Sequence, residues 1–161
     1  MPPAIDINPA TASDLRYIQT TLRRHWISTT VWSRDVPFEA DSLPAFIAWL
    51  DGEPSGLLTY SPAETETEII TLSSDREGRG IGTALLRAAQ AEAAARGHRR
   101  LFLTTSNDNL HALRFYQRQG WRITAVYPGA IDRSREREPA LPLVGARGIE
   151  SHDELELELR L

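Results

Sequence analysis

Near the start of the chain, the spacing of apolar residues changes from that of a strand to that of a helix. Residues 4–8 alternate apolar and polar side chains, which predicts a short strand. Thr11 and Asp14 have the spacing of a capping box, with the threonine at the N-cap position. Apolar residues then recur on one helical face: Leu15, Ile18, Leu22 and Trp26. We therefore expect a helix over about residues 12–25.

The middle of the chain contains a predicted hairpin and a further strand. Asp51-Gly52 separates two apolar runs, at residues 45–50 and 56–60. An Asp-Gly pair between such runs is a strong hairpin signal. Residues 64–73 alternate again and predict another strand.

Helices and strands alternate after residue 80. The pattern predicts helices over residues 83–96 and 109–118, and strands over 101–105, 121–127 and 153–161. Gly97 and Gly120 follow the two helices, where glycine commonly terminates a helix.

Two segments lack a regular pattern. Residues 27–43 are interpreted as a loop with one short helix, and residues 128–152 as a long, proline-containing connection. Within the second segment, the mixed-sign run 133–138 is interpreted as a solvated loop. The order of elements predicts a mixed α/β or α+β sheet of about seven strands with three to four helices, in one domain over residues 1–161.

The composition excludes several classes of protein. The net charge is −4, so the basic footprint of a nucleic-acid-binding protein is absent. The chain has no cysteine, which excludes disulfides, thiolate metal sites and a cysteine nucleophile, and its 4 histidines lack metal-site spacing, so no metal is expected. It has neither an apolar run long enough to span a membrane nor a secretory leader. We therefore expect a cytoplasmic protein without a membrane partner.

The most informative segment is a glycine-rich turn between a predicted strand and a predicted helix. It reads Glu77-Gly78-Arg79-Gly80-Ile81-Gly82-Thr83. Glycines let backbone N–H groups converge while the helix directs its positive end at them, an arrangement that suits phosphate. A Walker loop is excluded because the chain has no lysine, and a dinucleotide fingerprint because its third glycine would fall on Thr83 or Leu85. A turn that merely joins strand to helix is the alternative.

Two motifs in this region resemble those of the GNAT superfamily of N-acetyltransferases. Gly80-Ile81-Gly82, followed by Thr-Ala-Leu-Leu, is similar to the coenzyme A signature of that family. Residues 109–121 are similar to its N-x-x-A-x-x-F-Y-x-x-x-G-F/W segment. The motifs occur in the order and separation of the family, and the likeness covers residues 45–127.

The resemblance implies a GNAT-like fold and transfer of an acetyl group from acetyl-CoA, the cosubstrate, to a primary amine by direct attack in a ternary complex. Tyr116 matches the family's tyrosine that acts as general acid toward the sulfur; an aromatic anchor for its helix is the alternative. The strand before the turn is expected to offer backbone groups at Leu72 and Ser73 to the pantetheine and the thioester. The other residues implied at the coenzyme are Glu77, Gly78, Arg79, Gly80, Ile81, Gly82, Thr83 and Asn109.

Two of these implied coenzyme-binding residues have an additional interpretation. Glu77 departs from the family pattern, which has Gln or Arg there, and a carboxylate near a diphosphate is unfavourable unless it points outward. Asn109 is also a predicted N-cap of its helix.

Acidic residues point to the other substrate. Glu64, Glu66 and Glu68 share one face of their predicted strand, where they repel one another unless they are solvated or face cations. Glu68 is the candidate general base, acting directly or through a water; an exposed acidic face is the alternative. This face suggests a cationic acceptor, a small-molecule or peptide amine. The family usually builds its variable acceptor wall from the region that holds Arg23, His25, Trp26 and Trp32.

Two questions stay open at this point. A coenzyme A-binding sensor or interaction module without transfer activity is the alternative to an acetyltransferase, and thiol release with any amine separates the two. Residues 129–152 either cover the acceptor side or contribute to a homodimer.

Overall fold

The computed structural model describes residues 4–145 and 147–161. Its elements are β1 (Ile5–Pro9), η1 (Ala12–Asp14), α1 (Leu15–Trp26), β2 (Thr30–Ser33), β3 (Val36–Glu39), η2 (Ala40–Ser42), β4 (Ala45–Leu50), β5 (Glu53–Pro62), β6 (Glu66–Ser74), α2 (Ile81–Ala95), β7 (Arg100–Ser106), α3 (Leu110–Arg118), β8 (Arg122–Tyr127), α4 (Ala130–Arg137) and β9 (Glu154–Arg160); η denotes a 3-10 helix. None of the described helices is both long and apolar enough to cross a bilayer.

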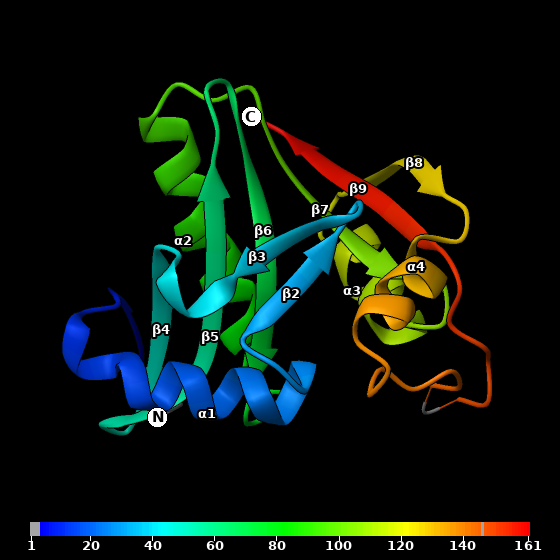
Figure 1. Cartoon of the computed structure of the whole chain (residues 1–161). Coiled ribbons are helices and arrows are strands. Elements are labelled where there is room, and N and C mark those ends of the chain that lie inside the picture. Colours follow the sequence, from blue (N-terminus) through cyan, green and yellow to red (C-terminus); the bar gives the residue numbers. More distant parts are fainter. Residues whose placement is uncertain (1–3, 146) are drawn as a thin grey trace.

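Seven strands form one mixed sheet in the order β1-β4-β5-β6-β7-β9-β8, and β2 and β3 form a separate hairpin (Figure 1). Within the sheet, β6 and β7 pair in parallel, and the other neighbouring strands are antiparallel. Strand β9 inserts between β7 and β8, so a late segment of the chain completes the sheet. The predicted mixed sheet of about seven strands is confirmed.

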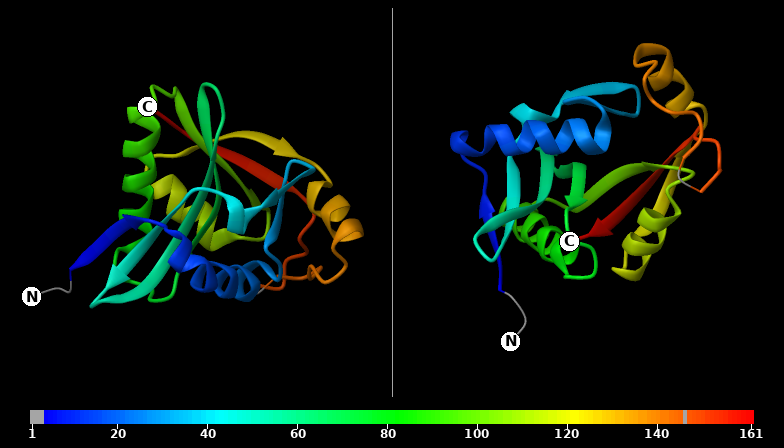
Figure 2. Two further views of the ribbon diagram at one scale, coloured as in Figure 1. Left: turned by 60° about the vertical axis from the view of Figure 1, so that its left-hand side comes forward. Right: turned by 90° about the horizontal axis from the view of Figure 1, so that it is seen from below.

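Each face of the sheet has its own core. Helices α2 and α3 pack on one face, where Leu85, Leu86 and Tyr116 join a large cluster of buried residues. Helix α1 covers the other face through Ile18 and Leu22. The view from below in Figure 2 separates α1 and the β2–β3 hairpin from α2 and α3, with the sheet between them.

Local sequence signals account for several of these elements. The Asp51-Gly52 turn joins β4 to β5, as the predicted hairpin required, and both of its φ angles are positive, at 52° and 77°, as in a type I′ turn. The capping box is also confirmed, because the Thr11 N–H donates to the Asp14 carboxylate at 2.8 Å. The predicted helix over 12–25 is present as η1 followed by α1.

The prediction of a loop over residues 27–43 is wrong in part. Strands β2 and β3 form a hairpin there, followed by the short helix η2. The hairpin turn consists of Arg34 and Asp35, whose φ angles are 50° and 64°. Neither residue is glycine or asparagine, so the usual signal is missing. Both are held by distant parts of the chain instead: Arg34 by Glu68 at 2.8 Å and Asp35 by Arg133 at 2.9 Å.

The interpretation of residues 133–138 as a solvated loop is also wrong. Helix α4 covers most of this run, and its Ser134 is buried. Arg135 donates to the backbone oxygens of Leu141 and Ser151, at 3.3 and 2.6 Å. These contacts fold the following segment back onto the helix, which the mixed charges alone do not indicate.

Candidate functional site

The sheet opens between β6 and β7. These strands pair only over residues 66–68 and 100–102, and the described ladder ends there. Strand β6 has a bulge at Ile70, which its pairing with β5 skips. A bulge bends a strand and changes where its backbone groups point. A narrow cavity of about 120 Å³ lies where the strands diverge; it is lined by Trp26, Ile69, Ile70, Thr71, Leu72, Leu103, Thr104, Thr105, Asn109, Ala112 and Tyr116.

Helix α2 begins at Ile81, within the glycine-rich segment and directly after Gly80. Gly80 is its N-cap with a φ of 80°, and Gly78 has a φ of 75°. A side chain would strain the backbone at both positions. The first N–H groups of a helix have no intrahelical partner, and the positive end of the helix dipole lies with them. The turn therefore offers donors and positive partial charge to a ligand beside it.

A cleft of about 480 Å³, here called the glycine-turn cleft, lies between this turn and α3. Its lining includes these residues predicted at the coenzyme: Leu72, Ser73, Glu77, Gly78, Gly80, Ile81, Gly82, Thr83 and Asn109. Arg79 lies on the same turn, but its side chain is exposed and outside this lining. The Thr83 hydroxyl accepts a hydrogen bond from the Gln119 amide at 2.8 Å.

Five residues that line the cleft were missed by the sequence prediction: Ser74, Arg76, His111, Ala112 and Phe115. Arg76 brings a cation to the wall that also carries Glu77, and it stands directly before the glycine motif. A cation at that place beside a phosphate-type turn was a usable signal. Phe115 packs close to Gly82, where a Cβ atom would lie 3.2 Å from the phenylalanine ring. Gly82, the second glycine of Gly80-Ile81-Gly82, therefore allows α2 and α3 to pack closely against each other.

Tyr116 lies at the junction of the glycine-turn cleft and the narrow cavity, and it lines both. Its ring is buried against Phe115 and Trp121, with ring centroids 5.2 and 5.3 Å away. Burial raises the pKa of the Tyr116 hydroxyl, so the phenol stays protonated at neutral pH. Helix α3, which carries the residue, begins at its predicted N-cap: the Asn109 side chain accepts from the Ala112 N–H at 3.2 Å.

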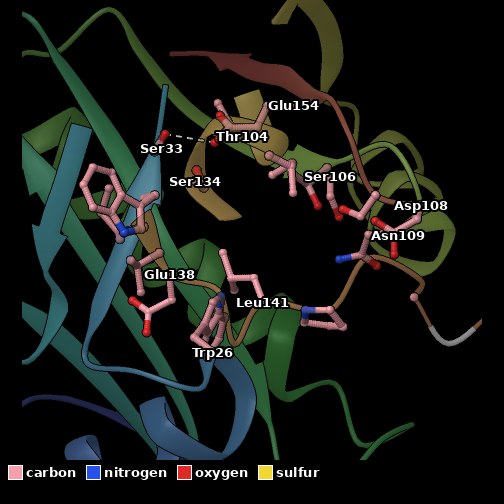
Figure 3. Close-up of a pocket in the computed structure, with 18 of the residues that line it drawn as sticks. Trp26, Ser33, Thr104, Ser106, Asp108, Asn109, Ser134, Glu138, Leu141 and Glu154 are labelled. Atoms are coloured by element: carbon pink, nitrogen blue, oxygen red, sulfur yellow. Dashed lines mark hydrogen bonds between the residues drawn. The ribbon is translucent and has the colours of Figure 1, made fainter. Parts of the chain in front are cut away.

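A third space, here called the outer pocket, has a volume of about 290 Å³ (Figure 3). The end of α1, the β2–β3 hairpin, β7, α4 and β9 all contribute to it, through residues that include Trp26, Trp32, Ser33, Thr104, Ser106, Asp108, Ser134, Glu138, Leu141 and Glu154. It shares Trp26, Thr104 and Asn109 with the narrow cavity. The three spaces therefore adjoin, with the narrow cavity between the other two.

Glu68 lies under this site and is only 4% exposed. Its carboxylate accepts from the Ser33 hydroxyl at 2.5 Å and from the Arg34 guanidinium at 2.8 Å. Ser33 is also 2.9 Å from the hydroxyl of Thr104. Glu68 itself is outside the linings of the three spaces, whereas both hydroxyls line the outer pocket.

Arginines face Glu66 and Glu68 on their strand and so reduce the repulsion between the two carboxylates. Arg100 contacts Glu66 at 2.8 Å, and Arg34 contacts Glu68. Of the residues expected in the acceptor wall, Trp26 and Trp32 line the outer pocket, whereas Arg23 and His25 have exposed side chains outside its lining.

Comparisons with known proteins agree with this geometry. Residues 12–121 match the model of the Acetyltransferase (GNAT) family. The chain is 37% identical over 133 residues to the protein YdhI of Bacillus subtilis strain 168, covering 82% of this chain and 83% of that one.

Solved structures show the same fold. A GNAT family acetyltransferase from Elizabethkingia anophelis, with acetyl-CoA bound, has a TM-score of 0.71 at 22% identity and 98% coverage of both chains. The IAA acetyltransferase from Bacillus cereus ATCC 14579 has a TM-score of 0.73 at 22% identity, covering 98% of this chain and 100% of that one. With its splayed strands, its glycine turn and these matches, the chain belongs to the GNAT family of acetyltransferases.

Proposed function

We propose that this protein is an acetyl-CoA-dependent N-acetyltransferase that acts on a primary amine of a small molecule or peptide, by direct attack in a ternary complex. The observation that carries the proposal is the continuity of the three spaces. Tyr116 lines both the glycine-turn cleft and the narrow cavity, and the narrow cavity adjoins the outer pocket. A donor in the first space and an acceptor in the third can therefore meet beside Tyr116.

The donor side is suited to a diphosphate. The free N–H groups after Gly80 and the positive end of α2 face the cleft, and Arg76 adds a full charge. Glu77 is exposed, so its carboxylate can turn toward solvent and away from the phosphates. Leu72 and Ser73, at the end of the splayed strand, would lie along the pantetheine arm.

The reaction forms one bond and breaks one. The neutral amine nitrogen attacks the thioester carbonyl, the new N–C bond forms, the C–S bond breaks, and the sulfur leaves with a proton. An alkyl amine with a pKa of about 10.4 is charged at pH 7, and its deprotonation costs roughly 4.6 kcal/mol. The site must therefore take a proton from the ammonium and supply one to the sulfur.

Tyr116 is the group that would protonate the sulfur. It is held protonated by burial and stands where the donor cleft adjoins the narrow cavity. A hydrogen bond to a developing thiolate stabilises the charge that appears only as the C–S bond breaks, which is the condition for lowering the barrier.

Glu68 is the proposed proton acceptor, and it would act through hydroxyl groups. Ser33 and Thr104 line the outer pocket and lead to the Glu68 carboxylate through contacts of 2.9 and 2.5 Å. A proton from the acceptor ammonium could pass along this chain while the carboxylate stays buried in its contact with Arg34.

Thiol release from acetyl-CoA tests the proposal. The chain has no cysteine, so any free thiol that appears is coenzyme A, and it has no lysine, so self-acetylation is limited to the N-terminal amine. A panel of diamines, amino acids, amino sugars and peptides should contain acceptors that raise thiol release above hydrolysis. If acetyl-CoA binds but no amine raises thiol release above hydrolysis, the protein is a coenzyme A-binding module without transfer activity.

A further inference from the structure

The sheet face beside the β2–β3 hairpin carries a group of carboxylates that is almost fully matched by arginines. Its glutamates on β6 and β9 are Glu66, Glu68, Glu154, Glu156 and Glu158. Arg100 contacts Glu66, Glu156 and Glu158 at 2.8, 3.1 and 2.8 Å. Arg34 contacts Glu68 at 2.8 Å. In the described part of the chain, Glu154 is the member of this group that no arginine side chain contacts.

Glu154 is nevertheless buried. It is 2% exposed, and one carboxylate oxygen, Oε2, accepts from the Arg34 backbone N–H at 2.9 Å. The other oxygen, Oε1, is shielded from solvent and has no hydrogen-bond partner among the described residues. Burial raises the pKa of Glu154, and the Arg34 backbone N–H and the nearby Thr104 side chain offset only part of that effect. A buried carboxylate oxygen without a partner is uncommon in folded proteins, and a donor from a ligand is one way to satisfy it.

The outer pocket supplies the space for that donor. Glu154 lines it from the start of β9, and Figure 3 shows the residue at the rim of the space that Asp108 and Glu138 also border. The Asp108 oxygen Oδ1 is a second buried acceptor without a partner among residues 4–145 and 147–161. No arginine, lysine or histidine is among the described residues of this lining. The pocket is thus built to receive positive charge.

The position of Glu154 separates this charge from the chemistry. Tyr116 lines the narrow cavity and the glycine-turn cleft, whereas Glu154 lines the outer pocket and neither of the other two. A cation at Glu154 would lie in the outer pocket, whereas the nitrogen that attacks the thioester would lie in the narrow cavity beside Tyr116. An acceptor that fills both places has a reactive amine at one end and a second cation at the other.

We infer that the acceptor is a small primary amine with a second, distal cationic group, of the aliphatic diamine class, and that Glu154 holds the distal cation. This inference rests on the proposed function. The distal cation is unchanged by the reaction, and its pairing with Glu154 orients the chain so that the other nitrogen enters the narrow cavity. Glu154 is therefore a specificity-determining residue in this assignment.

Three amines with the same four-carbon chain test the inference in the thiol-release assay: diaminobutane, butylamine and aminobutyrate. With the wild-type protein we expect kcat/KM for diaminobutane to exceed that for butylamine by roughly tenfold or more, and aminobutyrate to be the poorest. Equal values for the diamine and the monoamine would overturn the inference and leave the proposed function intact.

The variant Glu154→Gln keeps the size of the side chain and removes its charge. We expect the preference for diaminobutane over butylamine to fall to about one, mainly through KM for the diamine. Glu158→Gln is the matched control on the same strand and face, because Glu158 contacts Arg100 and lies outside the outer pocket. It should keep the preference. An equal effect of both variants would reject the role of Glu154.

Two measurements without turnover complete the test. Calorimetry with saturating coenzyme A should detect diaminobutane binding to the wild type and at least about tenfold weaker binding to Glu154→Gln. If this holds while no amine is acetylated, the cation site stands and the proposed function fails. The melting temperature of ligand-free Glu154→Gln should equal or exceed that of the wild type, because the variant removes an unpaired buried charge. A lower melting temperature together with unchanged diamine binding would make Glu154 a structural residue.

Discussion

Replacing Tyr116 by phenylalanine removes one oxygen atom from the site and leaves the ring in place. The contacts of the ring with Phe115 and Trp121 are available to phenylalanine as well. Desolvation is the one cause of the raised pKa of the Tyr116 hydroxyl. Among the described residues, the hydroxyl has no hydrogen-bond partner that would be left unsatisfied in the phenylalanine variant. We therefore expect the free energy of unfolding to change by less than about 1 kcal/mol.

The effect on turnover should be much larger than the effect on stability. A hydrogen bond to a charged group contributes about 1.5–3 kcal/mol, and here the charge on the sulfur appears only in the transition state. Loss of the hydroxyl should therefore lower kcat by roughly 10- to 150-fold. Burial raises the pKa of Tyr116, so the hydroxyl is protonated across the range of a normal assay and the loss should be nearly independent of pH from about 6 to 9.

The measurement is steady-state thiol release, with coenzyme A affinity from calorimetry and stability from thermal unfolding. Tyr60→Phe is the control, because Tyr60 lies in the same buried cluster and outside the described spaces of the site. The expected pattern is a loss of kcat in Tyr116→Phe with little change in coenzyme affinity. Wild-type turnover in that variant, or an equal loss in the control, would refute the role of the hydroxyl.

Three further predictions concern the base, the turn and a pH-dependent contact. Glu68→Gln should lower kcat by about 100-fold if the carboxylate takes the proton. Replacing its partner Arg34 by a neutral residue should leave most of the turnover. Equal losses in the two variants would indicate that only the ion pair matters. Gly80→Ala and Gly97→Ala should each cost about 1–2 kcal/mol of stability, because both glycines have left-handed φ angles, but only the first should weaken coenzyme A binding in calorimetry. The hydrogen bond of His152 to Asp132 raises the pKa of the imidazole, so its contribution to stability is complete below the ordinary value of about 6.5 and is lost as the pH rises through the raised value. The denaturation midpoint of the wild type should therefore fall more than that of His152→Gln between about pH 6 and 9, and parallel profiles would contradict this.

The sequence was sufficient to predict the parts of the fold that local patterns specify. The Asp51-Gly52 turn, the capping box at Thr11 and the cap at Asn109 all depend on residues within four positions of one another. The glycine turn was likewise readable, because a left-handed backbone at Gly78 and Gly80 requires the residue type that marks it.

Apart from Trp26 and Trp32, the residues of the outer pocket could not be predicted, because they are brought together only by the fold. The hairpin turn at Arg34 and Asp35 is held by Glu68 and Arg133, which lie far along the chain. Glu154 carried no local signal either, since it begins a strand that alternates leucine with charge. Its distinction from Glu156 and Glu158 is that no arginine reaches it in the described structure, and that depends on how three strands pair.

The place of β9 in the sheet has a consequence for biosynthesis. Strand β8 pairs only with β9 within the described sheet, yet it is translated first, and Ile123 and Val126 on it are exposed even in the finished fold. Until residues 154–160 leave the ribosome, β8 is an unprotected edge that other chains can pair with. A chain that stops short of this segment should be prone to aggregation as well as inactive.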